Sequence, residues 1–320
     1  MDYTEKREFI KRALDTSNVF HSGSTEGGKV NPKIWDRRLR EFQRKILLIA
    51  PQAEQFDFRS PGQDYTVTID EEPDAALDAT ELSNLDVVPF STRQVTFDPS
   101  EKGVAYQLTR AQAVRAFFNV AERMVTKLGY ALGRKKDAEA YSEAVANGGH
   151  TIIAGGRAST ADLTSSDVLE YDLIIEAAKK IGKAQYLPVD LFISFQQKED
   201  LLKDDKVHKA DAFGSRSAVA EGLIGSLFGV NIYVCHSIVD EEQTLGDTDD
   251  IYYNNALMLG TTMTGERSLG YAIKRDALIE REYHALGRYW DIVAHEEYDF
   301  KVLHPQGIVK IQTYAGVQSA

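Results

Sequence analysis

Residues 109–147, TRAQAVRAFFNVAERMVTKLGYALGRKKDAEAYSEAVAN, form the strongest pattern in the chain. Apolar residues recur there at spacings of three and four, which predicts an amphipathic helix. They include Val114, Phe117, Phe118, Ala121, Val125, Leu128 and Leu132. Thr109 is a suitable N-cap, and Asn147-Gly148-Gly149 ends the pattern. At about 1.5 Å per residue the helix would be roughly 55–60 Å long, with Gly129 and Gly133 as expected bend points.

The segments before this helix predict an N-terminal arm and then a β excursion. Residues 4–14 and 32–49 have helical patterns, and a polar, glycine-rich stretch joins them. Residues 55–70 and 87–97 alternate apolar and polar side chains, which predicts two strands running out and back. The acidic stretch 71–86 would form their tip. A lone two-stranded ribbon is marginally stable in water, so we expect it to lie on another surface, of its own subunit or of a neighbour.

The second half of the chain predicts alternating helices and strands. Asp167 is expected to cap a helix that runs to about Ala184, and residues 187–194 indicate a buried strand followed by a second helix. The segment from Val219 to Leu227 is predicted to be a short helix closed by Gly229. Further strands are predicted at 230–236, 252–259, 269–274, 278–302 and 308–313. This order of elements indicates an α+β protein.

Charge is distributed unevenly along the chain. The 320 residues carry 37 Lys and Arg against 49 Asp and Glu, a formal net charge of −12. Residues 1–50 hold eleven basic and seven acidic groups, a net of +4, whereas residues 52–101 hold two basic and twelve acidic groups, a net of −10. An acidic chain is not a general nucleic-acid binder, although a local basic segment can contact one. Two adjacent segments of opposite charge have two interpretations. They can meet across a contact between subunits, or both can be solvated surfaces.

The sequence carries no recognised catalytic or cofactor motif. It contains no G-x-x-x-x-G-K-[ST], G-x-G-x-x-G, G-x-S-x-G or H-E-x-x-H sequence. The single cysteine, Cys235, excludes an intrachain disulfide and a multi-cysteine metal site. Because Cys235 and His236 are adjacent on a predicted strand, their side chains diverge, and Cys235 is interpreted as structural. We therefore expect no catalytic, cofactor-binding or metal-binding residues, and a protein that is not an enzyme.

Two charged runs receive a structural interpretation. The run Arg134-Lys135-Lys136 lies on the helix predicted over residues 109–147. It indicates a solvated face or ion pairs rather than a phosphate site. His295-Glu296-Glu297 lacks the second histidine of a zinc motif and lies in a strand-like stretch.

No stretch approaches the roughly 18 apolar residues of a membrane span, so we expect no membrane partner. The charged N-terminal residues do not resemble a signal peptide, which indicates synthesis in the cytosol.

Four stretches carry a resemblance to a known family. TVTIDEEPDAALDATELSN (66–84), followed by VVPFSTRQVTF, looks like an extended loop, and GVAYQLTRAQAV (103–114) then enters the long helix. LPVDLFISFQQKEDLLKDDKVHKADAFGSRSAVAEGLIGSLFGVNIYVCHSI (187–238) runs from a strand ending in Ser through a helix to a glycine-punctuated apolar segment, and VLHPQGIVKIQ (302–312) closes the chain. In this order they resemble the major capsid protein of tailed double-stranded-DNA phages, which has the Hong Kong 97-type fold.

The resemblance implies five parts. They are an N-terminal arm (1–52), an extended β-loop (53–106), the spine helix of a peripheral domain (107–160), an α/β axial domain (161–270) and return strands of the peripheral domain (271–320). It also implies a structural protein that assembles in the host cytoplasm into an icosahedral virion capsid of hexamers and pentamers around double-stranded DNA. Its implied partners are itself, a portal protein, a decoration protein and the packaged DNA, contacted non-specifically.

In such a shell we expect opposite charges to meet between subunits. The acidic loop would lie over a neighbour, and its residues are Asp70, Glu71, Glu72, Asp74, Asp78 and Glu81. The basic residues of the arm and loop base would sit at subunit contacts, and the arm could instead face the DNA. These residues are Lys29, Lys33, Arg37, Arg38, Arg40, Arg59 and Arg93.

Two features depart from other members of the family. Some members cross-link subunits through a Lys in the extended loop and an Asn elsewhere, but residues 52–101 contain no Lys. We therefore expect no covalent cross-links, and a single band of monomer mass after boiling in SDS. Some members also carry an N-terminal scaffolding domain, for which this chain has no room, so a separate scaffolding protein is expected.

Two alternative functions stay open at this point. One is an encapsulin-type nanocompartment shell, which shares the fold and encloses a cargo protein. The other is a cytosolic α/β enzyme with an unrecognised site. The long arm and the long acidic loop favour the viral interpretation over the first. The contents of purified particles would discriminate these two, and a stable monomer with a deep polar pocket would support the enzyme.

Overall fold

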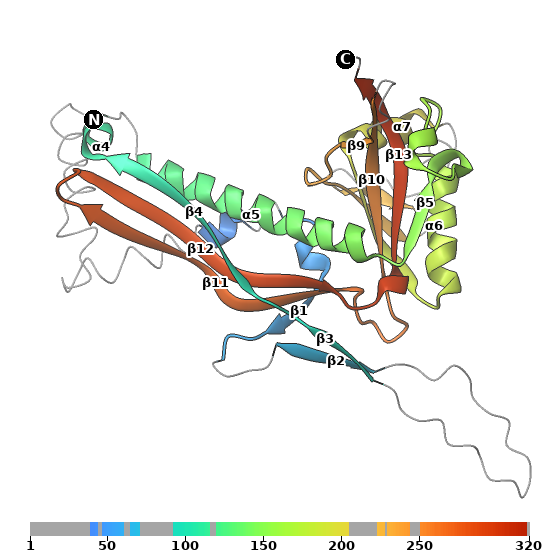
Figure 1. Ribbon diagram of the computed structural model, residues 1–320, viewed down its shortest axis with the longest axis horizontal. Helices are drawn as coiled ribbons and strands as arrows, with labels where there is room; N and C mark the ends of the chain where they lie inside the picture. Colours follow the sequence, from blue (N-terminus) through green and yellow to red (C-terminus); the bar gives the residue numbers. More distant parts are fainter. Residues whose placement is uncertain are drawn as a thin grey trace, which may run out of the picture.

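The computed structural model describes residues 39–43, 47–60, 65–70, 92–115, 120–204, 223–227, 229–243 and 250–318. Figure 1 shows an elongated unit, in which a long helix lies along a sheet of long strands, joined to a more compact unit, in which helices pack beside a second sheet. A separate two-stranded ribbon extends below them (Figure 1). The predicted α+β class is confirmed.

The predicted spine is present as α4 (Arg110–Arg115) and α5 (Val120–Asn147). Thr109 caps its start as predicted. Its Oγ1 accepts from the backbone N–H of Gln112, and its own N–H donates to Gln112 Oε1, each over 3.2 Å. This reciprocal pair is a capping box and satisfies two backbone donors at the helix start. The start of the spine is therefore fixed by local sequence.

The two glycines of the spine serve close packing. A Cβ atom at Gly129 would lie 2.9 Å from the backbone oxygen of Leu39, and one at Gly133 would lie 3.1 Å from the backbone oxygen of Gln43. Residues 39–43 are helical, so these glycines let a second helix approach α5 closely. The helix predicted to reach Ile49 ends earlier, because residues 47–49 are not helical.

A four-stranded sheet lies along the spine, in the order β1-β11-β12-β4. Its strands are β1 (Glu54–Asp57), β4 (Ser100–Thr109), β11 (Leu269–His284) and β12 (Tyr289–Val302). β1 pairs with β11 in parallel, and the other pairs are antiparallel. Ile292 and Ala294 of β12 belong to one buried cluster with Val125, Leu128 and Leu132 of α5. The apolar stripe that predicted the helix is thus the stripe that packs on this sheet.

The second sheet has seven strands. They are β5 (His150–Ile153), β6 (Leu187–Ile193), β7 (Leu223–Leu227), β8 (Val230–Val234), β9 (Glu241–Gln243), β10 (Asp250–Thr261) and β13 (Ile308–Gln318). The order is β5-β13-β10-β6-β8-β7, with β9 also on β10. Helix α6 (Tyr171–Lys183) buries Ile174, Ala177 and Ile181 in the cluster that contains the strand residues Leu191 and Val309. Helix α7 (Phe195–Lys203) follows β6 directly.

Short 3-10 turns connect these elements. They are η2 (Ala50–Gln52), η3 (Ala154–Gly156), η4 (Thr160–Asp162) and η5 (Pro305–Gly307). The last of these is the turn that Pro305-Gln306-Gly307 predicts between two strands. A buried cluster that includes Tyr141 and Ala144 of α5, Phe192 and Tyr298 joins the two sheets. The spine therefore reaches from one unit into the core of the other.

The ribbon consists of β2 (Thr66–Asp70) and β3 (Thr92–Thr96), which pair antiparallel with each other. Ile69 belongs to a buried cluster with Phe97, Phe58 and Leu303, so the ribbon packs on its own chain. Within the predicted extended loop 53–106, β1 and β4 pair in the four-stranded sheet and only the segment between them forms the ribbon. The five domain boundaries stay a prediction.

The segment predicted as a helix up to Leu227 is corrected by the structure. Residues 223–227 form strand β7, which pairs antiparallel with β8. Gly229 has a φ of 81°, so it supplies the left-handed turn of a hairpin rather than a helix end. The apolar spacing there fits either structure, and pairing with β8 decides between them. Residues 219–222 lie outside the described residues.

The predicted cap of α6 is also corrected. Asp167 Oδ2 accepts from the backbone N–H and the hydroxyl of Thr164, both at 2.8 Å, and from Arg157 Nε at 3.0 Å. It therefore closes a local turn, because a nearby hydroxyl and amide compete for its carboxylate. The helix begins later, at Tyr171, whose N–H donates to Asp204 Oδ2 over 3.0 Å.

Candidate functional site

Most of the charged residues predicted at subunit contacts lie outside the described residues. This holds for Glu71, Glu72, Asp74, Asp78, Glu81, Lys29, Lys33, Arg37 and Arg38. Asp70 is the last residue of β2 and is exposed. Arg40, Arg59 and Arg93 are described, and each makes a contact within its own chain. Their roles between subunits stay predictions.

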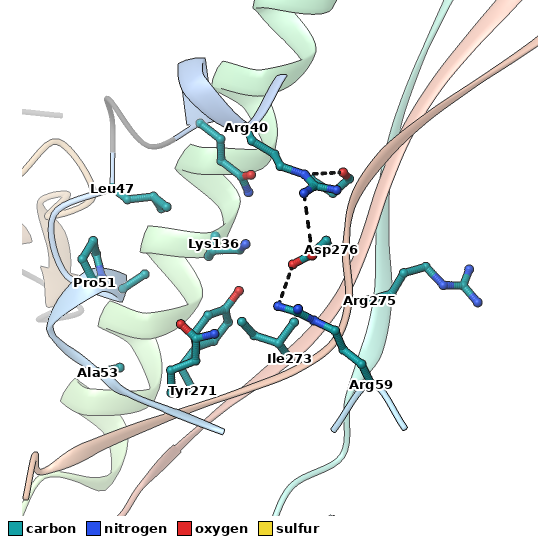
Figure 2. A pocket seen from close by; sticks show the side chains of 14 residues that line it. Arg40, Leu47, Pro51, Ala53, Arg59, Lys136, Tyr271, Ile273, Arg275 and Asp276 are labelled. Atoms are coloured by element: carbon teal, nitrogen blue, oxygen red, sulfur yellow. Dashed lines mark hydrogen bonds and ion pairs between the residues drawn. The ribbon is translucent and has the colours of Figure 1, made fainter. Parts of the chain in front are cut away.

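Arg40 and Arg59 converge on one carboxylate, that of Asp276. The Nη1 atom of Arg40 lies 3.8 Å from Asp276 Oδ2, and the Nη2 atom of Arg59 lies 3.1 Å from Asp276 Oδ1. Figure 2 shows the two guanidinium groups approaching Asp276 from opposite sides. Arg40 also donates from Nε to the backbone oxygen of Ala277 over 3.2 Å, and Arg59 Nη1 lies 3.5 Å from Asp57 Oδ2. The sequence prediction thus selected two arginines that share a site, although they are 19 positions apart.

These arginines line a groove with a volume of about 660 Å³, which we call the arginine groove. Its walls come from residues 40–59 on one side and from α5 and β11 on the other. The lining side chains include Gln43, Pro51, Gln55, Lys136, Tyr271 and Asp276. Arg275 also borders it, but Figure 2 shows that side chain directed away from the others.

Arg93 has a different place. Its Nη2 atom donates to the backbone oxygen of Leu303, which follows β12. The ribbon strand β3 is thereby tied to the four-stranded sheet. Arg93 therefore holds the ribbon against its own chain near the end where Asp70 pairs with Thr92.

Lys136, which lines the arginine groove, belongs to a buried ion pair. Lys136 Nζ lies 2.6 Å from Glu296 Oε2, and Gln43 Nε2 donates to both oxygens of that carboxylate, at 3.0 and 2.8 Å. Burial alone lowers the pKa of Lys136, but the Glu296 carboxylate and Tyr271 more than offset this, so its pKa lies above the ordinary value. Lys136 is therefore charged, and the pair is structural, as the ion-pair interpretation of residues 134–136 predicts.

Asp137, the next residue of the spine, holds the chain segment that precedes β1. Its Oδ1 atom accepts from the backbone N–H groups of Leu48, Ile49 and Ala50, at 3.1, 2.7 and 3.1 Å. These bonds satisfy three backbone donors of a segment whose residues 47–49 are not helical. The Oδ2 atom lies 3.4 Å from Cys235 Sγ.

Cys235 is buried and confirms the structural interpretation. Burial first, and then the negative charge of Asp137, raises the pKa of the Cys235 thiol to about 12. A thiol with so high a pKa is a poor nucleophile at neutral pH. His236 instead packs against the ring of Phe195, with centroids 4.8 Å apart.

Two searches of the described part of the chain, for metal-ligand groups and for membrane-spanning helices, found none. Within it, no group of three or more His, Cys, Asp or Glu residues is placed to hold a metal ion. None of the described helices has the length and apolar composition needed to cross a membrane. The chemistry of the arginine groove is that of ion pairing and hydrogen bonding.

Sequence reasoning missed three acidic residues of this region, Asp137, Asp276 and Glu296. One signal was present: Lys136 falls four residues after Leu132 and four before Ala140, within the apolar stripe of the spine. A charged residue in a buried stripe requires a buried partner. Nothing in the sequence identifies that partner as Glu296, which is 160 positions away.

Comparison with solved structures defines the class of protein. The chain is similar to the capsid of Ralstonia phage GP4 (15% identity, TM-score 0.63, covering 95% of this chain and 100% of that one). It is also similar to the capsid of cyanophage P-SCSP1u (16% identity, TM-score 0.61, 83% and 87% covered) and to a virus-like particle from Pyrococcus furiosus (13% identity, TM-score 0.55, 88% and 98% covered). These likenesses confirm the Hong Kong 97-type capsid fold. A search of curated proteins finds no match.

A family model gives the more specific result. The model described as phage capsid protein matches residues 93–311, more than half of the chain, and the chain belongs to this family. The match runs from β3 through the spine and both sheets to β13. The protein is a phage major capsid protein, the structural subunit of an icosahedral shell.

Proposed function

We propose that copies of this chain assemble as hexamers and pentamers into the head of a tailed phage, around its double-stranded DNA genome. The observation that carries this proposal is the family match across the spine and both sheets, together with a fold that covers the whole capsid chain of phage GP4. The role is structural rather than catalytic. Assembly takes place in the host cytoplasm with a separate scaffolding protein, and the finished shell also includes a portal protein and a decoration protein.

The ribbon is the proposed element of contact between subunits. Among the described strands, β2 and β3 pair with each other alone, and Asp70 is exposed where the acidic stretch begins. In this proposal the acidic loop lies over a neighbouring subunit, and the basic arm sits at subunit contacts or faces the DNA. In this proposal contacts with DNA are non-specific, and they stay weak because the chain as a whole is acidic and repels a polyanion.

Deletion of residues 66–96 tests the ribbon directly. We expect the shortened subunit to fold, because the strands that pair in the two sheets lie outside this segment. It should fail to form shells, which electron microscopy and sedimentation would show, while circular dichroism and a cooperative thermal transition confirm folding. Normal shells from the deletion variant would contradict this role for the ribbon.

A nanocompartment is the second candidate, and the likeness to the Pyrococcus furiosus particle is the observation behind it. At 13% identity that likeness concerns the fold alone, whereas the family match favours the phage. The contents of particles from infected cells separate the two. We expect double-stranded DNA protected from nuclease, and a protein cargo in its place would favour the nanocompartment.

A further inference from the structure

We propose that the arginine groove is the binding site for the acidic segment 70–81 of a second copy of this chain. This inference rests on the proposed assembly of the shell and assigns the place on the neighbour that receives the loop.

The groove presents cationic donors that its own chain leaves available. Each guanidinium has five N–H groups. Within the described part of the chain, Arg40 donates one hydrogen bond, to Ala277, and Arg59 donates one, to Asp276. The side chains of Arg40 and Arg59 are 43% and 44% exposed, so their remaining donors face the solvent of the groove. A planar fork of this kind binds carboxylates well.

The carboxylate of Asp276 forms an ion pair with each arginine and so positions both side chains. Asp276 lies between the two guanidinium groups (Figure 2) and is half-buried. At 3.8 Å the contact with Arg40 is longer than a hydrogen bond, so an incoming carboxylate can pair with Arg40 without displacing Asp276. The groove therefore holds two preformed, spaced cations rather than a saturated ion-pair network.

The rest of the lining gives the groove a firm base. Lys136 is fixed there by Glu296, and Gln43 is fixed by the same carboxylate. Pro51 and Tyr271 add apolar surface to the lining. A volume of about 660 Å³ exceeds what a single ion requires and suits a short peptide segment.

The chain itself carries a segment of matching charge. Residues 70–81, DEEPDAALDATE, contain six carboxylates, and no Lys or Arg occurs between Arg59 and Arg93. Asp70, the residue with which this segment begins, is exposed at the end of β2. The groove of a second copy is then the complementary surface, and opposite charges fix the register of such a contact.

Nucleic acid is the competing anion, because phosphates also bind arginines. The observations favour the acidic peptide segment. The described groove carries Asp276 at its centre, and the chain has a net charge of −12, whereas nucleic-acid sites present clustered Lys and Arg on a basic face. A short DNA duplex therefore serves as the competitor in the test.

Peptide binding to the intact subunit tests the proposal. The probe is a labelled peptide of residues 68–84, titrated into full-length subunits whose own loop is neutralised by Glu71→Gln, Glu72→Gln and Asp74→Asn. We expect binding that weakens as salt rises, and a loss of roughly tenfold or more on Arg40→Gln with Arg59→Gln. A peptide with every Asp and Glu replaced by Asn and Gln should not bind.

Asp276→Asn is the matched control. It removes the two ion pairs between Asp276 and the arginines, which the arginine variants also lose, but it raises the positive charge of the groove. We expect the peptide to bind this variant at least as tightly as before. A loss equal to that of the arginine variants would mean that the arginines only hold the local structure, and it would overturn the proposal. So would unchanged binding without the arginines, no binding at low salt, or displacement by the DNA duplex.

A charge exchange tests the same contact inside the shell. Arg40→Glu with Arg59→Glu should block assembly, and adding Glu71→Lys with Glu72→Lys should restore it in part. Particle formation by the unmodified protein is scored separately. Shells that form while the exchange restores nothing overturn the groove assignment alone, whereas an unmodified chain that never forms shells contradicts the proposed function.

Discussion

The ammonium of Lys136 lies 2.6 Å from the carboxylate of Glu296, and both side chains are buried. The pair joins the spine α5 to strand β12, and Gln43 brings the segment before β1 to the same carboxylate. Three parts of the chain that are remote in sequence therefore meet at one polar centre. The rings of Tyr271 and Tyr298 also face the ammonium of Lys136, with centroids 5.3 and 4.8 Å from its Nζ atom.

Breaking this pair from one side should be costly. Lys136→Met leaves the Glu296 carboxylate buried without its cation, and we expect a loss of about 3–5 kcal/mol in the free energy of unfolding. Denaturant unfolding of subunits that are kept from assembling would measure this change in the free energy of unfolding. In the double variant Lys136→Met with Glu296→Gln no buried charge remains and Gln43 keeps an acceptor, so much of the loss should be recovered. Additive losses in the double variant would contradict this account.

Two glycine substitutions should have opposite effects. Gly129→Ala places a Cβ 2.9 Å from the backbone oxygen of Leu39, and we expect destabilisation of about 1–3 kcal/mol from the forced shift. Gly182→Ala in α6 meets nothing within 4 Å, so the better helix propensity should stabilise by about 0.5–1 kcal/mol. Thermal unfolding compares the two. Equal shifts in Tm would show that propensity rather than close packing decides at Gly129.

The thiol of Cys235 should be inert in the folded subunit. Its pKa is raised to about 12 by burial and by Asp137, so the folded state keeps the proton at pH values where an unfolded thiol, with a pKa near 8.5, loses it. Its contribution to stability is full below about pH 8.5 and falls as the pH rises toward 12. A thiol reagent at pH 8 should label the protein only after denaturation. Full labelling of native shells would contradict this prediction.

The sequence predicts best where a local pattern decides the structure. The spine follows from an apolar stripe, and its start follows from Thr109, whose partner Gln112 is three residues away. The same holds for β6, since the run 187–194 is mostly apolar and its residues 190–193 are buried on both faces. Each of these elements is specified by residues within one or two turns or one strand.

The sequence predicts poorly where a residue distant in the chain decides the local structure. The apolar spacing of 223–227 fits a helix or a strand, and its pairing with β8 selects the strand. Asp167 has the sequence position of a helix cap, yet Thr164 takes its carboxylate and Asp204 caps α6. In the candidate site, the charge of Arg40 and Arg59 was visible in the sequence, but Asp276 was not, because β11 brings it there from more than 200 positions away.

Electron microscopy of the purified full-length chain tests the central claim most directly. The account predicts closed icosahedral shells, or hexamers and pentamers that become shells under assembly conditions or with a scaffolding protein. The shells should dissociate completely into single chains in hot SDS, because residues 52–101 contain no Lys for a cross-link. A protein that remains a monomer under every assembly condition would contradict the account.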